Sequence, residues 1–70
     1  MTDVRADIAA NVWQVHAEVG QAVTTGQELM ILESMKMEIP IEAPVDGIVT
    51  AVSVAPGDVV KRGEVLVEIT

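Results

Sequence analysis

The chain has 70 residues and a formal net charge of −7, from 4 basic against 11 acidic residues. This length suits one domain near the lower size limit for folding around a single hydrophobic core. The absence of cysteine excludes disulfides and thiolate zinc sites. The acidic balance repels phosphate backbones and anionic lipid, which argues against nucleic acid and membrane surfaces as partners.

Aliphatic residues supply nearly all of the apolar half of the chain, and this composition favours a small sheet structure over a helical bundle. In chain order we expect a strand at 11–17, a turn at Gly20, a short crossing segment at Val23, a turn at Gly26, a strand at 29–33 and a hairpin at 34–37. After the hairpin we expect strands at 39–42 and 48–54, a turn at Gly57, a crossing segment at Val60, a turn at Gly63 and a last strand at 65–69.

The second half of the chain repeats the first with an offset of 37 positions, which separates Gly20 from Gly57 and Gly26 from Gly63. The same offset relates Val15 to Val52, Val23 to Val60 and Leu29 to Leu66. Two copies of one supersecondary unit therefore account for most of the domain. Copy one spans about 6–33, the hairpin 34–37 joins the copies, and copy two spans about 38–70.

This repeat predicts an all-β fold, a flattened barrel or sandwich of about eight short antiparallel strands in two sheets related by a quasi-two-fold axis. Because 34–37 joins the copies, Lys36 is expected at the tip of the connecting hairpin, with the two termini together at the opposite end. Lys36 stands between two methionines, and the candidate site is the whole stretch Glu33, Ser34, Met35, Lys36, Met37 and Glu38.

The stretch Glu33-Ser34-Met35-Lys36-Met37-Glu38 resembles the attachment site of biotinyl domains, the carrier components of biotin-dependent carboxylases. The surrounding frame is similar to the same family: Gly20-x-x-Val23-x-x-Gly26-x-x-Leu29, Ala43-Pro44-x-x-Gly47-x-Val49 and Gly57-Asp58-x-Val60-x-x-Gly63. The resemblance runs from about residue 12 to residue 69. Short motifs match by chance, so the duplicated frame is what makes the resemblance specific. Ser34 stands where alanine is more usual, and 6–11 lacks the Ala-Pro…Gly opening of copy two.

The resemblance implies a single biotinyl/lipoyl attachment domain over 1–70 with the hammerhead-type fold, and a carrier that is not itself an enzyme. It implies that a biotin protein ligase joins biotin covalently to Lys36. The arm then shuttles carboxyl groups between the active sites of biotin carboxylase and carboxyltransferase subunits. In this interpretation Met35 and Met37 are the flanking residues that partners recognise, and Glu33, Ser34 and Glu38 complete the hairpin. A shuttling arm favours a monomer, and the expected location is the cytoplasm.

Two alternatives remain open. Lipoyl domains share the fold and the hairpin, and lipoate would then be the cofactor; they usually carry Asp-Lys-Ala at the tip, so methionine on both sides of Lys36 points to biotin. An unmodified β-domain that acts only in assembly or binding is the second alternative.

Three expectations concern single residues outside Lys36. The lone histidine, His16, has no companions at metal-ligand spacing, so neither a metal site nor a catalytic residue is expected. Trp13 is expected to cover the core, because it is the largest apolar side chain. One of Met35 and Met37 is expected to pack partly inward, although an extended backbone would place both on the same side because they are two residues apart.

Overall fold

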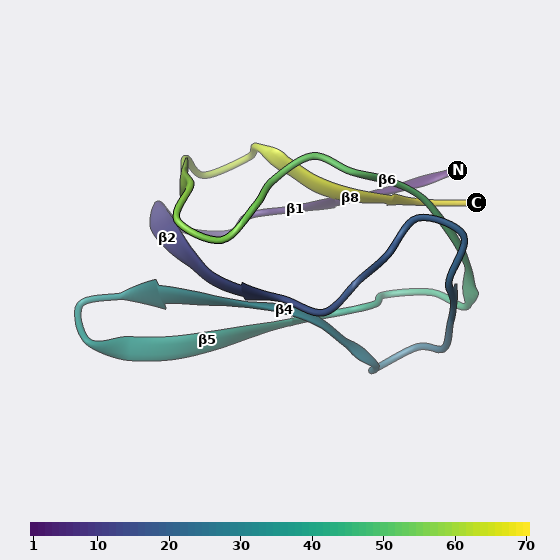
Figure 1. Ribbon diagram of the computed structural model, residues 1–70, viewed down its shortest axis with the longest axis horizontal. Coiled ribbons are helices and arrows are strands. Elements are labelled where there is room, and N and C mark those ends of the chain that lie inside the picture. Colours follow the sequence, from purple (N-terminus) through teal and green to yellow (C-terminus); the bar gives the residue numbers. More distant parts are fainter.

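The structure is a computed structural model that describes all residues 1–70 and contains strands but no helix. Two four-stranded antiparallel sheets, with strand orders β1-β8-β6-β3 and β5-β4-β2-β7, pack face to face (Figure 1). The predicted all-β fold class is confirmed. The strands are β1 (Thr2–Arg5), β2 (Ala10–Val15), β3 (Ala22–Val23), β4 (Glu28–Ser34), β5 (Met37–Glu42), β6 (Gly47–Val52), β7 (Val59–Val60) and β8 (Val65–Ile69).

The strand orders of the two sheets are related by the internal repeat. Exchanging β1 with β5, β2 with β6, β3 with β7 and β4 with β8 converts the order of one sheet into that of the other. Each sheet therefore contains strands from both copies, so neither copy forms a sheet alone. Copy one was expected to begin at about residue 6. The structure extends copy one to β1 at Thr2–Arg5, because β1 is the counterpart of β5 in copy two.

The turn glycines show the same symmetry in their hydrogen bonds. The Gly20 N–H donates to the Val49 carbonyl at 2.7 Å, and the Gly57 N–H donates to the Val12 carbonyl at 2.8 Å. Both pairs are related by the 37-residue offset. The φ angles are +91° at Gly20 and +95° at Gly57, a region that glycine adopts without steric penalty. The predicted turns therefore tie each copy to the other.

The core lies between the sheets and is entirely apolar. It contains 16 buried residues, none of them polar or charged. The inner strands β4 and β8 contribute the most deeply buried large side chains, Leu29, Met30, Leu32, Leu66 and Ile69. No helix of the structure is both long and apolar enough to cross a membrane.

Trp13 is not part of this core, so the expectation that it covers the core is wrong. Trp13 is 43% exposed, whereas the preceding residue, Val12, is 2% exposed. Successive side chains of a strand point to opposite faces, so burial of Val12 directs Trp13 outward. The register between β2 and β4 also shifts at this point, where Val12 faces Leu32 and Gln14 faces Ile31.

The termini and the hairpin between the copies occupy opposite ends of an elongated molecule (Figure 1). Its principal extents are 31 × 17 × 17 Å. Thr2 of β1 pairs with Ile69 of β8, which brings the two chain ends together. The turn between β4 and β5 lies at the far end. The expected placement of hairpin and termini is therefore observed.

The end that holds the termini contains two hydrogen bonds to a carboxylate, and acid should weaken them. The Thr25 N–H and the Thr25 hydroxyl both donate to Asp46 Oδ1, at 2.7 and 3.0 Å. These bonds, the backbone one first, lower the pKa of Asp46 below its ordinary value of 3.8. A carboxyl with a lowered folded-state pKa stabilises the fold above its unfolded pKa, and this contribution is lost as the pH falls through the folded value.

We therefore expect Asp46→Asn to lose less stability than the unsubstituted chain as the pH falls below about 4. Urea unfolding of both chains at a series of pH values from neutral to acid measures this difference. Equal losses in the two chains below pH 4 would contradict the assignment of the Thr25 bonds as the cause.

Candidate functional site

The β4–β5 hairpin ends in a two-residue turn formed by Met35 and Lys36. Ser34 and Met37 pair across it and close the turn. Both central residues have positive φ angles, 51° at Met35 and 65° at Lys36. Positive φ at both positions defines a type I′ turn, whose twist matches that of the flanking strands and which favours Asn-Gly. Neither Met35 nor Lys36 is a residue that this turn prefers.

The tip extends beyond the sheet that supports it. β2 pairs with β4 only as far as Asn11 opposite Glu33, and β5 is an edge strand. Ser34 and Met37 are therefore paired only with each other. The result is a narrow projection at one end of the molecule, visible on the left of Figure 1.

Lys36 is exposed on this projection and has no polar partner. The ion pairs of the structure are Arg5 with Asp3 and His16 with Glu28, and no side-chain hydrogen bond involves Lys36. The ε-amine is therefore free to enter the active site of another protein. A two-residue turn fixed by strand pairing also limits how far the base of the lysine arm moves.

Both methionines beside Lys36 are exposed, so the expectation that one packs partly inward is wrong. Met35 is 90% exposed and Met37 is 66% exposed. Met35 lies in the left-handed turn, where side chains do not alternate between faces as in a strand, and Met37 lies at the start of β5, beyond the part of the sheet that β2 supports. Exposed methionines give a flexible, polarisable surface that adapts to different partners.

Two carboxylates face each other below the tip. Glu33 and Glu38 are directly opposite in the register of β4 and β5, and both are exposed. Like charges opposite each other destabilise a sheet. The hairpin therefore carries an unfavourable charge pair and an unfavourable turn within six consecutive residues.

The destabilising effect of methionine at position 35 of the turn can be measured. We expect Met35→Asn to raise the free energy of unfolding by about 0.5–1 kcal/mol, because asparagine tolerates the left-handed region better than methionine. Urea unfolding of the two chains tests this, with Met37→Asn as the control at a neighbouring exposed position in the strand. Equal effects of the two substitutions would contradict strain at Met35.

A shallow hollow of about 300 Å³ lies beside the base of the hairpin. It is lined by residues 9–11, residues 33–35 and Val59. Asn11 pairs with Glu33 on one side and with Val59 on the other, so the hollow crosses β4, β2 and β7. No pattern in the sequence indicated this hollow. The available signal was Val59, an apolar residue at the exposed position next to the buried Val60.

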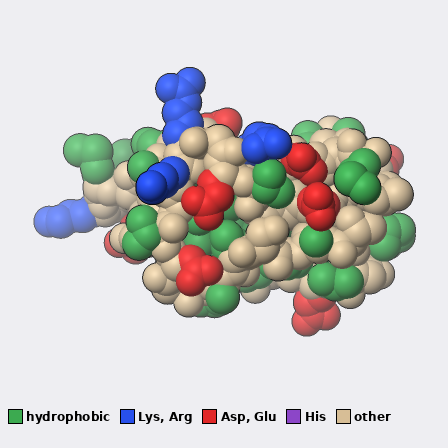
Figure 2. All heavy atoms as spheres, turned by 90° about the horizontal axis from the view of Figure 1, so that it is seen from above, with side chains coloured by type: hydrophobic (Ala, Val, Ile, Leu, Met, Phe, Trp, Pro, Cys, Tyr) green, Lys and Arg blue, Asp and Glu red, His purple; other side chains and the backbone are tan.

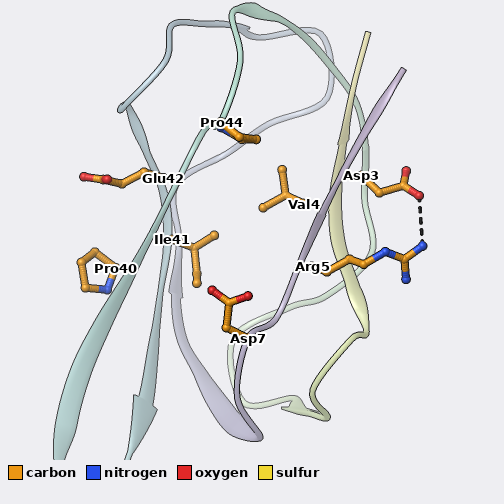
Figure 3. A pocket seen from close by; sticks show the side chains of 8 residues that line it. All are labelled: Asp3, Val4, Arg5, Asp7, Pro40, Ile41, Glu42 and Pro44. Carbon is orange, nitrogen blue, oxygen red and sulfur yellow. Dashed lines mark hydrogen bonds and ion pairs between the residues drawn. The ribbon is translucent and has the colours of Figure 1, made fainter.

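A second hollow, of about 390 Å³, lies between the edge strands β1 and β5 (Figure 3). Val4 and Ile41, both largely buried, point into it from the two strands. Its lining residues fall into pairs at the 37-residue offset, so it lies on the quasi-two-fold axis: Asp3 with Pro40, Val4 with Ile41, Arg5 with Glu42 and Asp7 with Pro44. It lies between the edge strands of the two sheets and is lined by none of the predicted site residues 33–38.

No group of three or more His, Cys, Asp or Glu side chains is arranged to hold a metal ion. His16 contacts Glu28, with 3.5 Å between Nε2 and Oε1. All six residues of the predicted site, from Glu33 to Glu38, lie together in the hairpin. The candidate site is therefore one exposed lysine at the tip of a projecting hairpin, with exposed methionines on both sides of it.

Fold and site together define a class of small β-domains that present a single lysine on the hairpin between two structural repeats. The family model described as "Biotin-requiring enzyme", for biotin and lipoyl domains, matches residues 1–69. The chain belongs to this biotin/lipoyl attachment family.

Two similar proteins are nearly the same size as this chain. A biotin/lipoyl attachment protein of Bacillus subtilis (strain 168) is 49% identical over 96% of this chain and 92% of its own length. A homologue of the biotinylated protein TB7.3 from Mycobacterium leprae (strain TN) is 48% identical over 97% of this chain and 96% of its own. Among solved structures, a single-chain, multi-domain long-chain acyl-CoA carboxylase superposes with a TM-score of 0.88 and 36% identity, over 94% of this chain but 7% of that one.

Proposed function

We propose that this chain is a biotin carrier and that Lys36 is its attachment residue. The observation that carries the proposal is the placement of Lys36, exposed and without an ion pair, at the tip of the hairpin between the copies. The similarity to a homologue of the biotinylated protein TB7.3 that has nearly the same length supports biotin as the attached group. In this role the domain spans residues 1–70 and works in the cytoplasm as a monomer.

The residues of the tip suit acylation by another enzyme. The Lys36 amine must lose a proton before it attacks an activated biotinyl group, and no base of this chain contacts it. A biotin protein ligase would therefore supply the base. The new amide bond forms between the Lys36 nitrogen and the biotinyl carbon, and the activating group leaves. Met35 and Met37, beside the amine, would contact the ligase.

Biotin on Lys36 would accept a carboxyl group at one active site and release it at another. The chain itself supplies the arm, its position and the contacts on either side of it. We propose biotin carboxylase and carboxyltransferase subunits as the partners at these two sites. The similarity of the fold to part of a long-chain acyl-CoA carboxylase supports partners of this class. The domain would catalyse neither reaction.

The attached group is tested by incubating the purified chain with ATP and either biotin and a biotin protein ligase, or lipoate and a lipoate ligase. We expect the mass of one biotinyl group to be added, and streptavidin to bind the product. Addition of a lipoyl group alone would favour the lipoyl alternative. A folded chain that accepts neither group would favour an unmodified assembly domain and refute the carrier function.

A further inference from the structure

The basic residues of this acidic chain are concentrated toward the hairpin. Figure 2 shows the Lys and Arg side chains from the hairpin end to the middle of the molecule, and none at the end that holds the termini, while Asp and Glu are spread over both. The pairing of strands agrees with this distribution. Arg5 is at the end of β1 away from the termini, opposite Val65, and Lys61 and Arg62 follow β7, which pairs with the start of β2.

Lys61 and Arg62 are exposed and take part in no ion pair. They occupy the turn between β7 and β8, where the Lys61 N–H donates to Glu64 Oε1 at 3.2 Å. The Lys61 and Arg62 side chains make no hydrogen bond that would restrain them. By contrast, the Arg5 side chain forms an ion pair with Asp3 at 3.3 Å and donates a hydrogen bond to the Gly63 carbonyl at 2.7 Å.

The internal repeat shows what is missing beside Arg62. At the 37-residue offset, Arg62 corresponds to Thr25 and Ala9 corresponds to Asp46. At the termini end, Thr25 donates two hydrogen bonds to Asp46. At the hairpin end, Ala9 stands in place of the carboxylate, and Arg62 stands in place of the threonine that donates to it. The substitution leaves Arg62 without an internal anion, and Ala9 becomes part of the lining of the hollow.

The hollow supplies an apolar contact on the same end of the molecule. Ala9, Ala10, Val59 and Met35 supply its apolar lining, and the polar lining residues are Asn11, Glu33 and Ser34. Val59 is 71% exposed and lies two residues before Lys61. A depression with a mixed apolar and polar lining, next to the turn that carries the free cations and adjoining the residue before Lys36, has the composition of a protein-binding surface.

We propose that the hollow together with Lys61 and Arg62, here the docking face, binds the enzyme that acylates Lys36, a partner whose surface carries carboxylates around a protruding apolar side chain. The choice of partner rests on the function proposed for Lys36. Charge complementarity carries the inference, because a partner that reaches Lys36 approaches the end where free cations are available on a chain of net charge −7. Charges at the rim of an interface chiefly accelerate association, and this effect weakens with salt.

The test compares two double variants of equal net charge in a steady-state assay with a biotin protein ligase, biotin and ATP. Lys61→Gln/Arg62→Gln removes two positive charges from the docking face. Gln21→Glu/Gln27→Glu adds two negative charges at the opposite end. The Gln21 and Gln27 side chains accept hydrogen bonds from the Glu18 and Thr24 N–H groups, and glutamate can accept the same bonds, as Glu64 does for Lys61.

We expect Lys61→Gln/Arg62→Gln to raise the KM for the carrier about fivefold at low salt with little change in kcat, and to reduce the salt dependence of KM. The control should keep KM within about twofold, since its added charges lie at the other end of a molecule 31 Å long and charges are screened over about 10 Å. Thermal unfolding checks that both variants are folded.

Each other outcome overturns a defined part of the inference. Equal rises in KM for both variants would show that net charge matters and the docking face does not. Unchanged KM in both would remove the docking face while leaving Lys36 as the attachment residue. Failure of the unsubstituted chain to accept biotin would instead refute the proposed function itself.

Discussion

Lys36→Arg is expected to accept no biotin at all, whereas Lys61→Arg should accept biotin to the same extent as the unsubstituted chain. These are the only lysines among the 4 basic residues, so two variants cover every lysine side chain. Arginine keeps the charge and much of the length of lysine, but its guanidinium is effectively always protonated and is not a nucleophile under these conditions. The measurement is intact mass after incubation with ligase, biotin and ATP.

The arginine variant isolates chemistry from structure. Lys36 has positive φ and is exposed, so arginine meets the same backbone constraint and loses no internal contact. We expect its free energy of unfolding to match that of the parent within about 0.5 kcal/mol. Incorporation of biotin into Lys36→Arg would show that another group, such as the N-terminal amine, is the acceptor, and would refute the proposed site.

The position of the hairpin could be predicted because the internal repeat is visible in the spacing of the turn glycines. Gly20, Gly26, Gly57 and Gly63 all adopt positive φ, a requirement that few other residues meet. Their spacing identified both copies and the segment between them. The place of Lys36 follows from that spacing, without any need to know how the side chains pack.

β1 could not be predicted in the same way. Only Val4 of its four residues is buried, and the strand is held by long-range pairing with β8. The match of β1 to its counterpart in copy two depends on Val4 and Ile41, the pair that points into the hollow between the edge strands. One apolar residue in a polar segment is too weak a pattern to predict a strand.

The geometry of the tip was also beyond sequence reasoning. A type I′ turn is normally indicated by Asn-Gly, and Met35-Lys36 gives no such signal. The register of β4 with β5 imposes the turn, since Ser34 must pair with Met37 and leaves two residues to reverse the chain. Tertiary pairing therefore overrides local preference at the candidate site, and such conflicts are expected at functional sites.

Gly47→Ala should have the largest effect on stability, at the end of the molecule away from Lys36. A Cβ at position 47 would lie 2.6 Å from both the Thr70 carbonyl oxygen and Ile69 Cγ2. The Thr70 backbone cannot move aside freely, because it exchanges two hydrogen bonds of 2.9 Å with Ile48. We expect a loss of about 2–3 kcal/mol in the free energy of unfolding, as for overpacked core positions.

Gly57→Ala is the matched control, because it separates steric clash from backbone strain. A Cβ at Gly57 would meet no atom within 4 Å, but its φ is +95°. The expected loss is therefore about 1 kcal/mol, from strain alone. Urea unfolding of both variants measures the difference, and a loss at Gly47 no greater than that at Gly57 would contradict the clash with the C-terminal strand.

Biotinylation of Gly47→Ala tests whether a loss of stability at one end of the molecule affects the acceptor lysine at the other. The substituted position contacts residues 69 and 70 beside the termini, whereas the lysine projects from the opposite end (Figure 1). Under conditions where most Gly47→Ala molecules are folded, we expect the same final extent of biotinylation as in the parent chain. Lys36→Arg should show the converse, full stability without biotin. The two variants would then separate the stability of the scaffold from the chemistry of the tip.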